Sequence, residues 1–375
     1  MRAIDARRFE SNGVHMNTSP AGRSDPAARP AHGRGSAINP TGRFEALRVT
    51  PDPDFDPSEL PSPRTQFFQD SASSLITRNT SPDVGFETSL NIYRGCEHGC
   101  SYCFARPFHE YLGYSAGLDF ETRIFVKTDA PQLLRHELSA KRWQPQVVVM
   151  SGVTDCYQPA ERHSKLTRAC LEVFAEFRNP ISIITKSAQI TRDLPILVEL
   201  AKFNAVRVCL SVTTLDRELA QRMEPRASLP AQRLRVIAEL SAAGIPVGVM
   251  AAPMIPGLTD HELPAILEAA KDAGAVSAGY ILLRLPHGVK EIFSTWLDEH
   301  EPGKKDRILS RLKELHGGKL YDSKWGERLT GTGLFARQLS QLFEVTARRL
   351  GLRTELTPLS TDAFMPAGGR QLTLF

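Results

Sequence analysis

Three cysteines lie close together in the run RGCEHGCSYCFARP. Three residues separate Cys96 from Cys100, and two separate Cys100 from Cys103. This spacing lets one loop surround a single metal centre, and soft thiolate ligands are typical of iron–sulfur clusters, zinc and copper. A cubane cluster normally takes four ligands, so three cysteines would leave one iron open to a further molecule.

Zinc is the alternative metal for the same loop. Either His98 or His109 can complete a site with three cysteines and one histidine, although most structural zinc sites pair two CxxC knuckles and no second pair follows. The chain has six cysteines. Because we expect a cytoplasmic protein, that number argues against a disulfide framework. Cys170 and Cys209 fall within helix and strand patterns and are interpreted as core residues.

The elements that must position this loop form a repeating pattern. From about residue 89, short β-branched runs alternate with amphipathic helical stretches, which is typical of strand–helix units around a parallel sheet. The pattern predicts an α/β fold, an incomplete barrel, with a doubly wound open sheet as the alternative. In either fold the chemistry belongs at the carboxyl ends of the strands. The six predicted strands are residues 90–93, 147–151, 181–185, 205–213, 246–252 and 278–283, and the predicted helices include 164–178, 230–243, 260–273 and 335–350.

The CxxxCxxC motif after the first predicted strand resembles the radical S-adenosylmethionine (radical SAM) superfamily. The resemblance implies an incomplete (β/α)6 barrel of the radical SAM type and a [4Fe–4S] cluster held by Cys96, Cys100 and Cys103. It implies that the open iron binds the amino and carboxylate groups of S-adenosylmethionine and that Tyr102 contributes to the adenine environment. Reductive cleavage then yields methionine and a 5′-deoxyadenosyl radical, which takes a hydrogen atom from a substrate.

Within that superfamily, residues 90–339 resemble the spore photoproduct lyase-like group. The resemblance implies cofactor-binding roles for polar residues at successive strand ends: Ser151, Gly152, Thr154 and Asp155 at the methionine end, Lys186 on its carboxylate, Ser211 and Thr213 near the ribose or carboxylate, and Glu224. Each has a structural alternative. Lys186 can be a surface lysine, Ser211 and Thr213 can satisfy backbone groups, and Glu224 can form a salt bridge at a helix end.

Two positions depart from the lyase pattern. Spore photoproduct lyase uses a cysteine at the second strand end as hydrogen donor and a tyrosine after the third cluster cysteine, where this chain has Gly152 and Phe104. Neither residue has a thiol or hydroxyl hydrogen to donate, so the hydrogen-atom transfer that the lyase uses in repair cannot occur in its usual form. Cys156 lies four residues beyond Gly152, and we predict it as a catalytic hydrogen donor, with a buried structural cysteine as the alternative.

The ends of the chain differ from its centre. We predict a largely disordered or loosely packed N-terminal segment (1–63), a barrel core (64–285), a C-terminal helical extension (286–362) and a flexible tail (363–375). The arginine-rich start is interpreted as a solvated linker, with a nucleic-acid arm as the alternative. Its stretch HGRGSAINPTGRF has spaced glycines and Phe44, which can let it lie against the folded body.

The last residues, QLTLF, resemble the short peptides that bind the bacterial replicative sliding clamp. In this predicted docking peptide the polar contact is Gln371 and the apolar anchors are Leu372, Leu374 and Phe375. A short flexible segment of this kind can insert a few side chains into a partner's pocket at little ordering cost. A final strand packed on its own domain is the alternative.

The charge and hydropathy leave several functions open. A net charge of +4 and a pI near 8.7 permit an anionic partner. No run of about 18 apolar residues can cross a bilayer, so no membrane contact is expected. The leading hypothesis is a radical enzyme that acts on DNA or another nucleic acid, in repair, with flavodoxin or ferredoxin as electron donor. The alternatives are radical modification of a protein or small metabolite, and a non-enzymatic, zinc-stabilised nucleic-acid-binding module.

Overall fold

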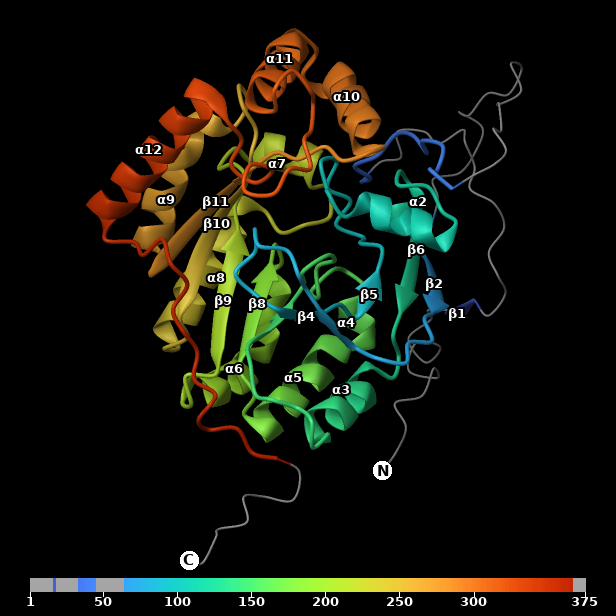
Figure 1. Cartoon of the computed structure of the whole chain (residues 1–375), viewed down its shortest axis with the longest axis vertical. Helices are drawn as coiled ribbons and strands as arrows, with labels where there is room; N and C mark the ends of the chain where they lie inside the picture. Colours follow the sequence, from blue (N-terminus) through green and yellow to red (C-terminus); the bar gives the residue numbers. More distant parts are fainter. Residues whose placement is uncertain (1–15, 18–32, 45–63, 367–375) are drawn as a thin grey trace, which may run out of the picture.

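The computed structural model describes residues 16–17, 33–44 and 64–366 (Figure 1). Its largest sheet has seven strands in the order β11-β10-β9-β8-β7-β4-β3. All neighbours pair in parallel except β3, which runs antiparallel to β4. Five of the six parallel strands overlap the predicted segments over most of their length, whereas the first shares only Leu90 with the predicted strand 90–93, and Tyr93 belongs to another sheet. Their bounds are β4 (Thr88–Leu90), β7 (Val148–Met150), β8 (Ile181–Thr185), β9 (Val206–Ser211), β10 (Val247–Met254) and β11 (Ser277–Leu282), and β3 is Ile76–Arg78.

The order of the parallel strands decides between the two predicted architectures. Each strand lies beside its neighbour in the sequence, with no reversal of direction along the sheet. A doubly wound sheet would reverse its order at a switch point and carry helices on both faces. The connecting helices instead cover one outer face of a curved sheet (Figure 1), so the fold is a partial barrel. These helices are α5 (Leu166–Phe177), α6 (Leu194–Ala201), α8 (Pro230–Ala242) and α9 (Leu263–Asp272).

Apolar periodicity explains why these segments pack as they do. Strand β8 reads ISIIT and is buried along nearly its whole length, as expected where side chains on both faces are covered. Helix α5 buries Cys170, Leu171, Phe174 and Phe177, which recur at helical spacing on the face toward the sheet. Full burial of one such phenylalanine contributes about 1.5–3 kcal/mol. The packed strands therefore present their carboxyl ends at one fixed edge.

A second, smaller sheet was not predicted. It has the order β1-β2-β6-β5, with strands β1 (Met16–Asn17), β2 (Gln66–Gln69), β6 (Arg123–Val126) and β5 (Tyr93–Arg94). These strands have two to four residues and include Gln and Arg, so they lack the apolar runs that mark the barrel strands. The chain between β5 and β6 contains the cysteine loop, η2 (Arg106–Leu112) and α2 (Asp119–Thr122). This sheet therefore supports both ends of that segment.

Residues 33–44, here called the strap, lie against the segment between β5 and β6. The backbone N–H of Gly35 donates to Glu121 Oε2 (3.0 Å), and the backbone N–H of Leu118 donates to the carbonyl of Ile38 (3.2 Å). The side chain of Asn39 accepts from the backbone N–H of Asp119 (3.1 Å). The stretch HGRGSAINPTGRF therefore does contact the folded body from Gly33 onward. The other residues of the predicted segment 1–63, apart from β1, lie outside the described residues.

The C-terminal extension packs beside the barrel. Helix α12 (Gly333–Leu350) lies on α9, and the ring of Phe343 is 4.9 Å from that of Tyr280 on β11.

In the described part of the chain no helix is long and apolar enough to span a membrane. The proposed docking residues Gln371, Leu372, Leu374 and Phe375 lie outside the described residues. The remaining helices are α3 (Ala130–Ser139), α4 (Glu161–Ser164), η3 (Ala188–Asp193), α7 (Arg217–Met223), η4 (Asp260–Glu262), α10 (Val289–His300), η5 (Pro302–Lys304) and α11 (Lys305–Leu315).

Candidate functional site

The cysteine loop is tied to the chain segments that follow β7 and β9. The backbone N–H of Glu97 donates to Gln158 Oε1 (2.8 Å), and that of Ser101 donates to the carbonyl of Met223 (3.0 Å). Gly99 has a φ of +67°, in the left-handed region that favours glycine. A Cβ atom at Gly99 would also lie 2.5 Å from Glu121 Oε2. The loop therefore has a fixed path at the mouth of the barrel.

The three thiols of the loop form one neighbourhood. Cys96 and Cys100 are buried, and Cys103 is half-buried and packs against the apolar groups around both. Burial raises the pKa of Cys96 well above its ordinary value, with nearby Asp155 and the other two cysteines adding to the shift. Burial likewise raises the pKa of Cys100 to about 12. A bound cation reverses this effect by stabilising thiolates, so the donor set fits a thiolate-bound metal cluster.

The side chains are not preset as a cage. Among the described residues, no three His, Cys, Asp or Glu side chains already have the geometry of a metal site. His98 lies against Asp155, with 3.4 Å between Nδ1 and Oδ2. His109 packs among the rings of Tyr114 and Phe120. Both histidines thus contact other groups, and Cys96, Cys100 and Cys103 stay the predicted ligands of the loop.

A buried ion pair under the loop was missed by the sequence analysis. Arg106 is fully buried, and its Nε donates to the carbonyl of Cys100 (2.9 Å) while Nη2 pairs with Glu121. The strap adds two donors to Glu121. The backbone N–H of Gly35 donates to its carboxylate, and Arg34 Nη1 donates to its backbone carbonyl (3.0 Å). Glu121 thus links the cysteine loop to the strap. The only sequence signal was an arginine three residues after Cys103.

Three predicted cofactor residues meet in a second buried network. The hydroxyl of Tyr102 donates to Glu224 and lies 3.2 Å from the hydroxyl of Thr213, which itself donates to Glu224 Oε1 (2.8 Å). Arg233 pairs with Glu224 and also donates to the carbonyl of Ser211 (2.9 Å). Burial alone would raise the pKa of Glu224, but the charges of Arg233 and Lys186 and the hydrogen bonds to it lower that pKa to about 2. Glu224 therefore stays ionised and fixes Tyr102.

Asp155 joins two strand ends to the cysteine loop. Its carboxylate accepts from the hydroxyl of Thr185 (2.8 Å) and from the backbone N–H of Lys186 (2.8 Å), and it faces His98. The ammonium of Lys186 lies 6.0 Å from the ring of Tyr102. The hydroxyl of Ser211 makes no hydrogen bond to any residue that the structure describes. Lys186 thus keeps a charged group near Tyr102, whereas the carboxylate of Asp155 is bound by protein groups.

The loop after β7 places its predicted residues in different directions. The hydroxyl of Thr154 donates to the carbonyl of Tyr93 (3.0 Å), so it braces β5. Ser151 has a φ of +75°, and its side chain accepts from the backbone N–H of Cys156 (2.8 Å). The side chain of Cys156 is only 2% exposed and packs in the main apolar core. A Cβ atom at Gly152 would make ordinary contacts with Ser89 (3.5 Å) and Phe86 (4.0 Å).

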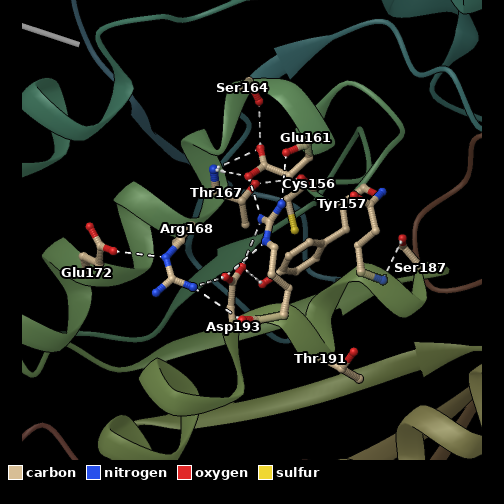
Figure 2. Close-up of polar contacts among 12 residues, drawn as sticks. Cys156, Tyr157, Glu161, Ser164, Thr167, Arg168, Glu172, Ser187, Thr191 and Asp193 are labelled. Atoms are coloured by element: carbon tan, nitrogen blue, oxygen red, sulfur yellow. Dashed lines mark hydrogen bonds and ion pairs between the residues drawn. The ribbon is translucent and has the colours of Figure 1, made fainter. Parts of the chain in front are cut away.

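Figure 2 shows the polar contacts that lie between this loop and α4, α5 and η3. Glu161 is buried and accepts from the backbone N–H of Thr167 (3.1 Å) and from Arg192 Nη2 (3.0 Å). The hydroxyl of Thr167 donates to the carbonyl of Cys156 (2.6 Å). Burial raises the pKa of Glu161 above its ordinary value. The hydrogen bonds to its carboxylate and the charge of Arg192 oppose this shift but do not cancel it. Glu161, Thr167 and Arg192 were not predicted, because each is ordinary in its local sequence and gains its role only through folding.

A cavity of about 520 Å³ opens next to the cysteine loop. Its walls come from six separate parts of the chain: the strap, the β3–β4 hairpin, the cysteine loop with η2, the segment after β7, the segment after β11, and the segment between α11 and α12. Of the predicted site residues, only Gly152 lines it, together with Phe104, the other position that departs from the lyase pattern. The described lining residues are Arg43, Arg78, Asn79, Ser81, Val84, Phe86, Ser89, Phe104, Pro107, Phe108, Tyr111, Gly152, Val153, Arg284, Pro286, His287, Tyr321 and Arg328.

The lining of the cavity has a single sign of charge. Four arginines line it, and none of the described lining residues is Asp or Glu. Five aromatic residues line it too, and three of them are well exposed: Phe104 (36%), Phe108 (51%) and Tyr111 (66%). Cations and exposed aromatic rings together are typical of surfaces that bind anionic ligands with flat rings.

The comparisons with known proteins agree with this geometry. The sequence model of the Radical SAM superfamily matches residues 90–270. An uncharacterized protein of Mycobacterium tuberculosis is 38% identical over 233 residues, which cover 62% of this chain and 67% of that protein. The chain belongs to the radical SAM superfamily. An uncharacterized protein of Methanocaldococcus jannaschii is 29% identical over 178 residues, covering 48% of this chain and 64% of that protein.

Solved structures support the fold assignment. Spore photoproduct lyase complexed with dinucleoside spore photoproduct superposes with a TM-score of 0.54 at 14% identity, over 77% of this chain and 81% of that chain. A mutant of the same lyase gives a TM-score of 0.57 at 14% identity, over 84% and 88%. At this identity the likeness establishes a shared fold. Membership of the superfamily makes this radical SAM protein an enzyme that uses S-adenosylmethionine and an iron–sulfur cluster.

Proposed function

We propose that this enzyme takes a hydrogen atom from a nucleic-acid substrate bound in the cavity beside the cysteine loop. The observation that carries the proposal is the lining of that cavity, which has four arginines, five aromatic residues and, among its described residues, no carboxylate. Nucleic acids combine phosphate charge with flat bases, so such a lining suits them better than a neutral metabolite. A structural neighbour with a dinucleoside bound adds support.

Cys96, Cys100 and Cys103 would hold a [4Fe–4S] cluster. When bound, the cluster supplies one electron that splits S-adenosylmethionine into methionine and a 5′-deoxyadenosyl radical, and that radical gains a hydrogen atom from the substrate to become 5′-deoxyadenosine. Tyr102, held by Glu224, would pack near the adenine. Lys186 and Ser211 would bind the polar end of the cofactor. A flavodoxin or ferredoxin would supply the electron.

The size of the cavity limits how the substrate is presented. A volume of about 520 Å³ falls within the range of about 300–1,000 Å³ that is typical of small-ligand pockets. A duplex cannot enter such a space, so the reacting nucleotide must be single-stranded or turned out of its helix. The exposed rings of Phe108 and Tyr111 at the cavity give a displaced base surfaces on which to stack.

The reaction would differ from photoproduct repair in the group that donates a hydrogen atom to the substrate radical. The two residues that depart from the lyase relay, Phe104 and Gly152, both line the cavity, and neither carries a transferable hydrogen on oxygen or sulfur. The thiol of Cys156 is buried in the core and is not among the described lining residues. A hydrogen-donor role for Cys156 stays a prediction, and it requires the loop after β7 to move.

Anaerobic turnover tests the proposal. The reconstituted full chain should bind about four irons, and with dithionite it should form 5′-deoxyadenosine from S-adenosylmethionine. Deuterium from the sugar or base of a labelled oligonucleotide should appear in that product by mass spectrometry. Cys96→Ala, Cys100→Ala and Cys103→Ala should each lose iron and activity, whereas Cys170→Ala, in the core of α5, should keep both.

Two results would contradict the proposal in different ways. A chain that binds zinc but no iron and leaves S-adenosylmethionine intact would favour the zinc-stabilised binding module. A chain that cleaves S-adenosylmethionine but takes no deuterium from single-stranded or duplex oligonucleotides would favour a protein or small-metabolite substrate. The same assay therefore separates the proposed function from both alternatives.

A further inference from the structure

Arg284 is a half-buried cation without an anionic partner in the described structure. It lies two residues after the end of β11 and lines the cavity. No residue that the structure describes accepts a hydrogen bond from its guanidinium or forms an ion pair with it. A guanidinium has five N–H donors, and leaving them without acceptors after partial burial is costly. The position is therefore suited to an external anion.

The other arginines of the cavity show the contrast. Arg43 pairs with Glu110 and donates to the carbonyl of Pro107 (3.3 Å). Arg328 forms an ion pair with Asp83. Arg78, on the exposed edge strand β3, has no acceptor among the described residues, but solvent already satisfies it. Arg284 alone combines burial, a place in the cavity and an unmet set of donors.

Phe104 fixes the direction of the Arg284 guanidinium. The guanidinium carbon lies 4.2 Å from the centre of the Phe104 ring, which is a close cation–π stack. One planar face is thus covered, and the N–H groups at the rim stay available for an acceptor. Phe104 directly follows Cys103, so an anion bound there would lie beside the cysteine loop and close to the reacting part of the substrate.

The charged groups around Arg284 do not neutralise it. Burial lowers its pKa from the ordinary value, Arg328 adds to that shift, and the groups that oppose it are Tyr321, Cys103 and Asp83. Asp83 is already paired with Arg328. A guanidinium remains charged in spite of such a shift, because its ordinary pKa is above 12.

We propose that Arg284 binds one backbone phosphate of a nucleic-acid strand and so sets which nucleotide reaches the cysteine loop. The inference rests on the proposed function, since it assumes a nucleic-acid substrate. A phosphodiester oxygen pair matches the fork of the guanidinium, and the resulting hydrogen bonds are charge-assisted. The stack on Phe104 orders the side chain before binding, so little conformational entropy is lost.

The test measures binding of a fluorescein-labelled single-stranded oligonucleotide to the anaerobically reconstituted full chain across a salt series. Arg284→Gln should weaken binding by about tenfold or more and should lower the slope of log K against log salt by about one. Arg235→Gln, which removes an exposed arginine on the outer helix α8, is the matched control and should leave the affinity nearly unchanged. Iron content and 5′-deoxyadenosine formation without oligonucleotide report whether each variant is folded.

A second measurement changes the oligonucleotide and begins with the unmodified protein. The oligonucleotide is altered one linkage at a time by replacing a phosphate with a neutral methylphosphonate. With the unmodified protein, one linkage should cost about tenfold in affinity, and with Arg284→Gln the same replacement should cost almost nothing more. Inorganic phosphate should compete only at much higher concentrations than the oligonucleotide.

Each outcome bears on a separate claim. If the unmodified protein binds no oligonucleotide, the nucleic-acid function itself is wrong and the inference falls with it. If it binds, but no single linkage matters and Arg284→Gln keeps both the affinity and the salt slope, only the role of Arg284 is overturned. Equal competition by inorganic phosphate would assign Arg284 to a free phosphate instead and would also overturn the strand-binding role.

Discussion

Gly35 lies so close to Gly99 that position 35 has no room for a side chain. A Cβ atom on Gly35 would lie 1.6 Å from the carbonyl oxygen of Gly99. Gly35 belongs to the strap and Gly99 to the cysteine loop, so this contact joins segments more than 60 residues apart in the sequence. It holds the strap flat against the loop that carries the three cysteines.

Gly35→Ala should therefore separate the strap from the loop. The added methyl group overlaps backbone rather than a flexible side chain, so we expect a loss of about 1–3 kcal/mol in the free energy of unfolding. Bound iron should also be lost faster to a chelator. Gly303→Ala, where a Cβ meets nothing within 4 Å, is the control and should change neither quantity. Equal behaviour of the two variants, measured by denaturant unfolding and iron release, would refute the tight contact.

His109 should make the folded state sensitive to mild acid. Burial, with Arg123 and Arg106 nearby, lowers its pKa from 6.5 to about 3. Below pH 6.5 the unfolded chain therefore takes up a proton that the folded chain refuses, so the free energy of unfolding falls as pH decreases, by up to about 1.4 kcal/mol per pH unit. His109→Phe should flatten this dependence between pH 6.5 and 5.

The controls for His109 are an exposed histidine and the metal content. His163→Gln should keep the pH dependence of the unmodified protein, because His163 lies on the surface of α4. His109→Phe should also retain iron, since its ring packs among aromatic residues. Loss of metal in His109→Phe would instead make His109 a ligand, as in the zinc alternative.

Glu161 and Glu172 offer a matched pair of carboxylates in the network of Figure 2. Glu161 is buried and accepts from Tyr93, Thr167 and Arg192, whereas Glu172 is 58% exposed and pairs with Arg168 at 3.3 Å. Glu161→Gln should cost about 2 kcal/mol or more, because the buried hydroxyl of Tyr93 and the buried N–H of Thr167 lose a charged acceptor. Glu172→Gln should cost less than about 1 kcal/mol. Thermal and denaturant unfolding of both variants would show equal losses if Glu161 were not part of a buried support.

Gly152 can accept a side chain that would point into the cavity. A Cβ there would meet Ser89 at 3.5 Å, which is ordinary contact. Gly152→Cys should therefore fold with unchanged stability, within about 0.5 kcal/mol, and its thiol should react with a maleimide faster than the buried Cys156 does. An oligonucleotide that fills the cavity should slow this reaction. Mass spectrometry of the labelled peptides measures both, and a thiol at position 152 that stays unlabelled would place this residue away from the cavity.

The barrel could be predicted because its elements are encoded locally. Strand β8 and helix α5 each carry an apolar pattern that is complete within a dozen residues, so periodicity alone locates them. The second sheet could not be found in this way. Its strands QFFQ and RIFV are held by pairing with each other across more than 50 residues, and their own sequence is too short and too polar to mark them.

The site shows the same division. The three cysteines and Tyr102 were found because one short motif contains them all. The support from Arg106 and Glu121 could not be found, since each residue gains meaning only when the strap and the loop meet in space. For Thr154 the family resemblance implied a cofactor contact, which stays a prediction, and in the structure its hydroxyl donates to the carbonyl of Tyr93 on the neighbouring sheet.

The cavity is divided unevenly between the family core and the rest of the chain. The part that matches the superfamily, residues 90–270, contributes Phe104, Gly152 and the aromatic side chains of η2. The four arginines among the described lining residues lie before or after that part, at positions 43, 78, 284 and 328. If the cavity binds the substrate as proposed, substitutions in the flanking segments alone can change the charge of its lining and leave the radical-forming barrel unaltered.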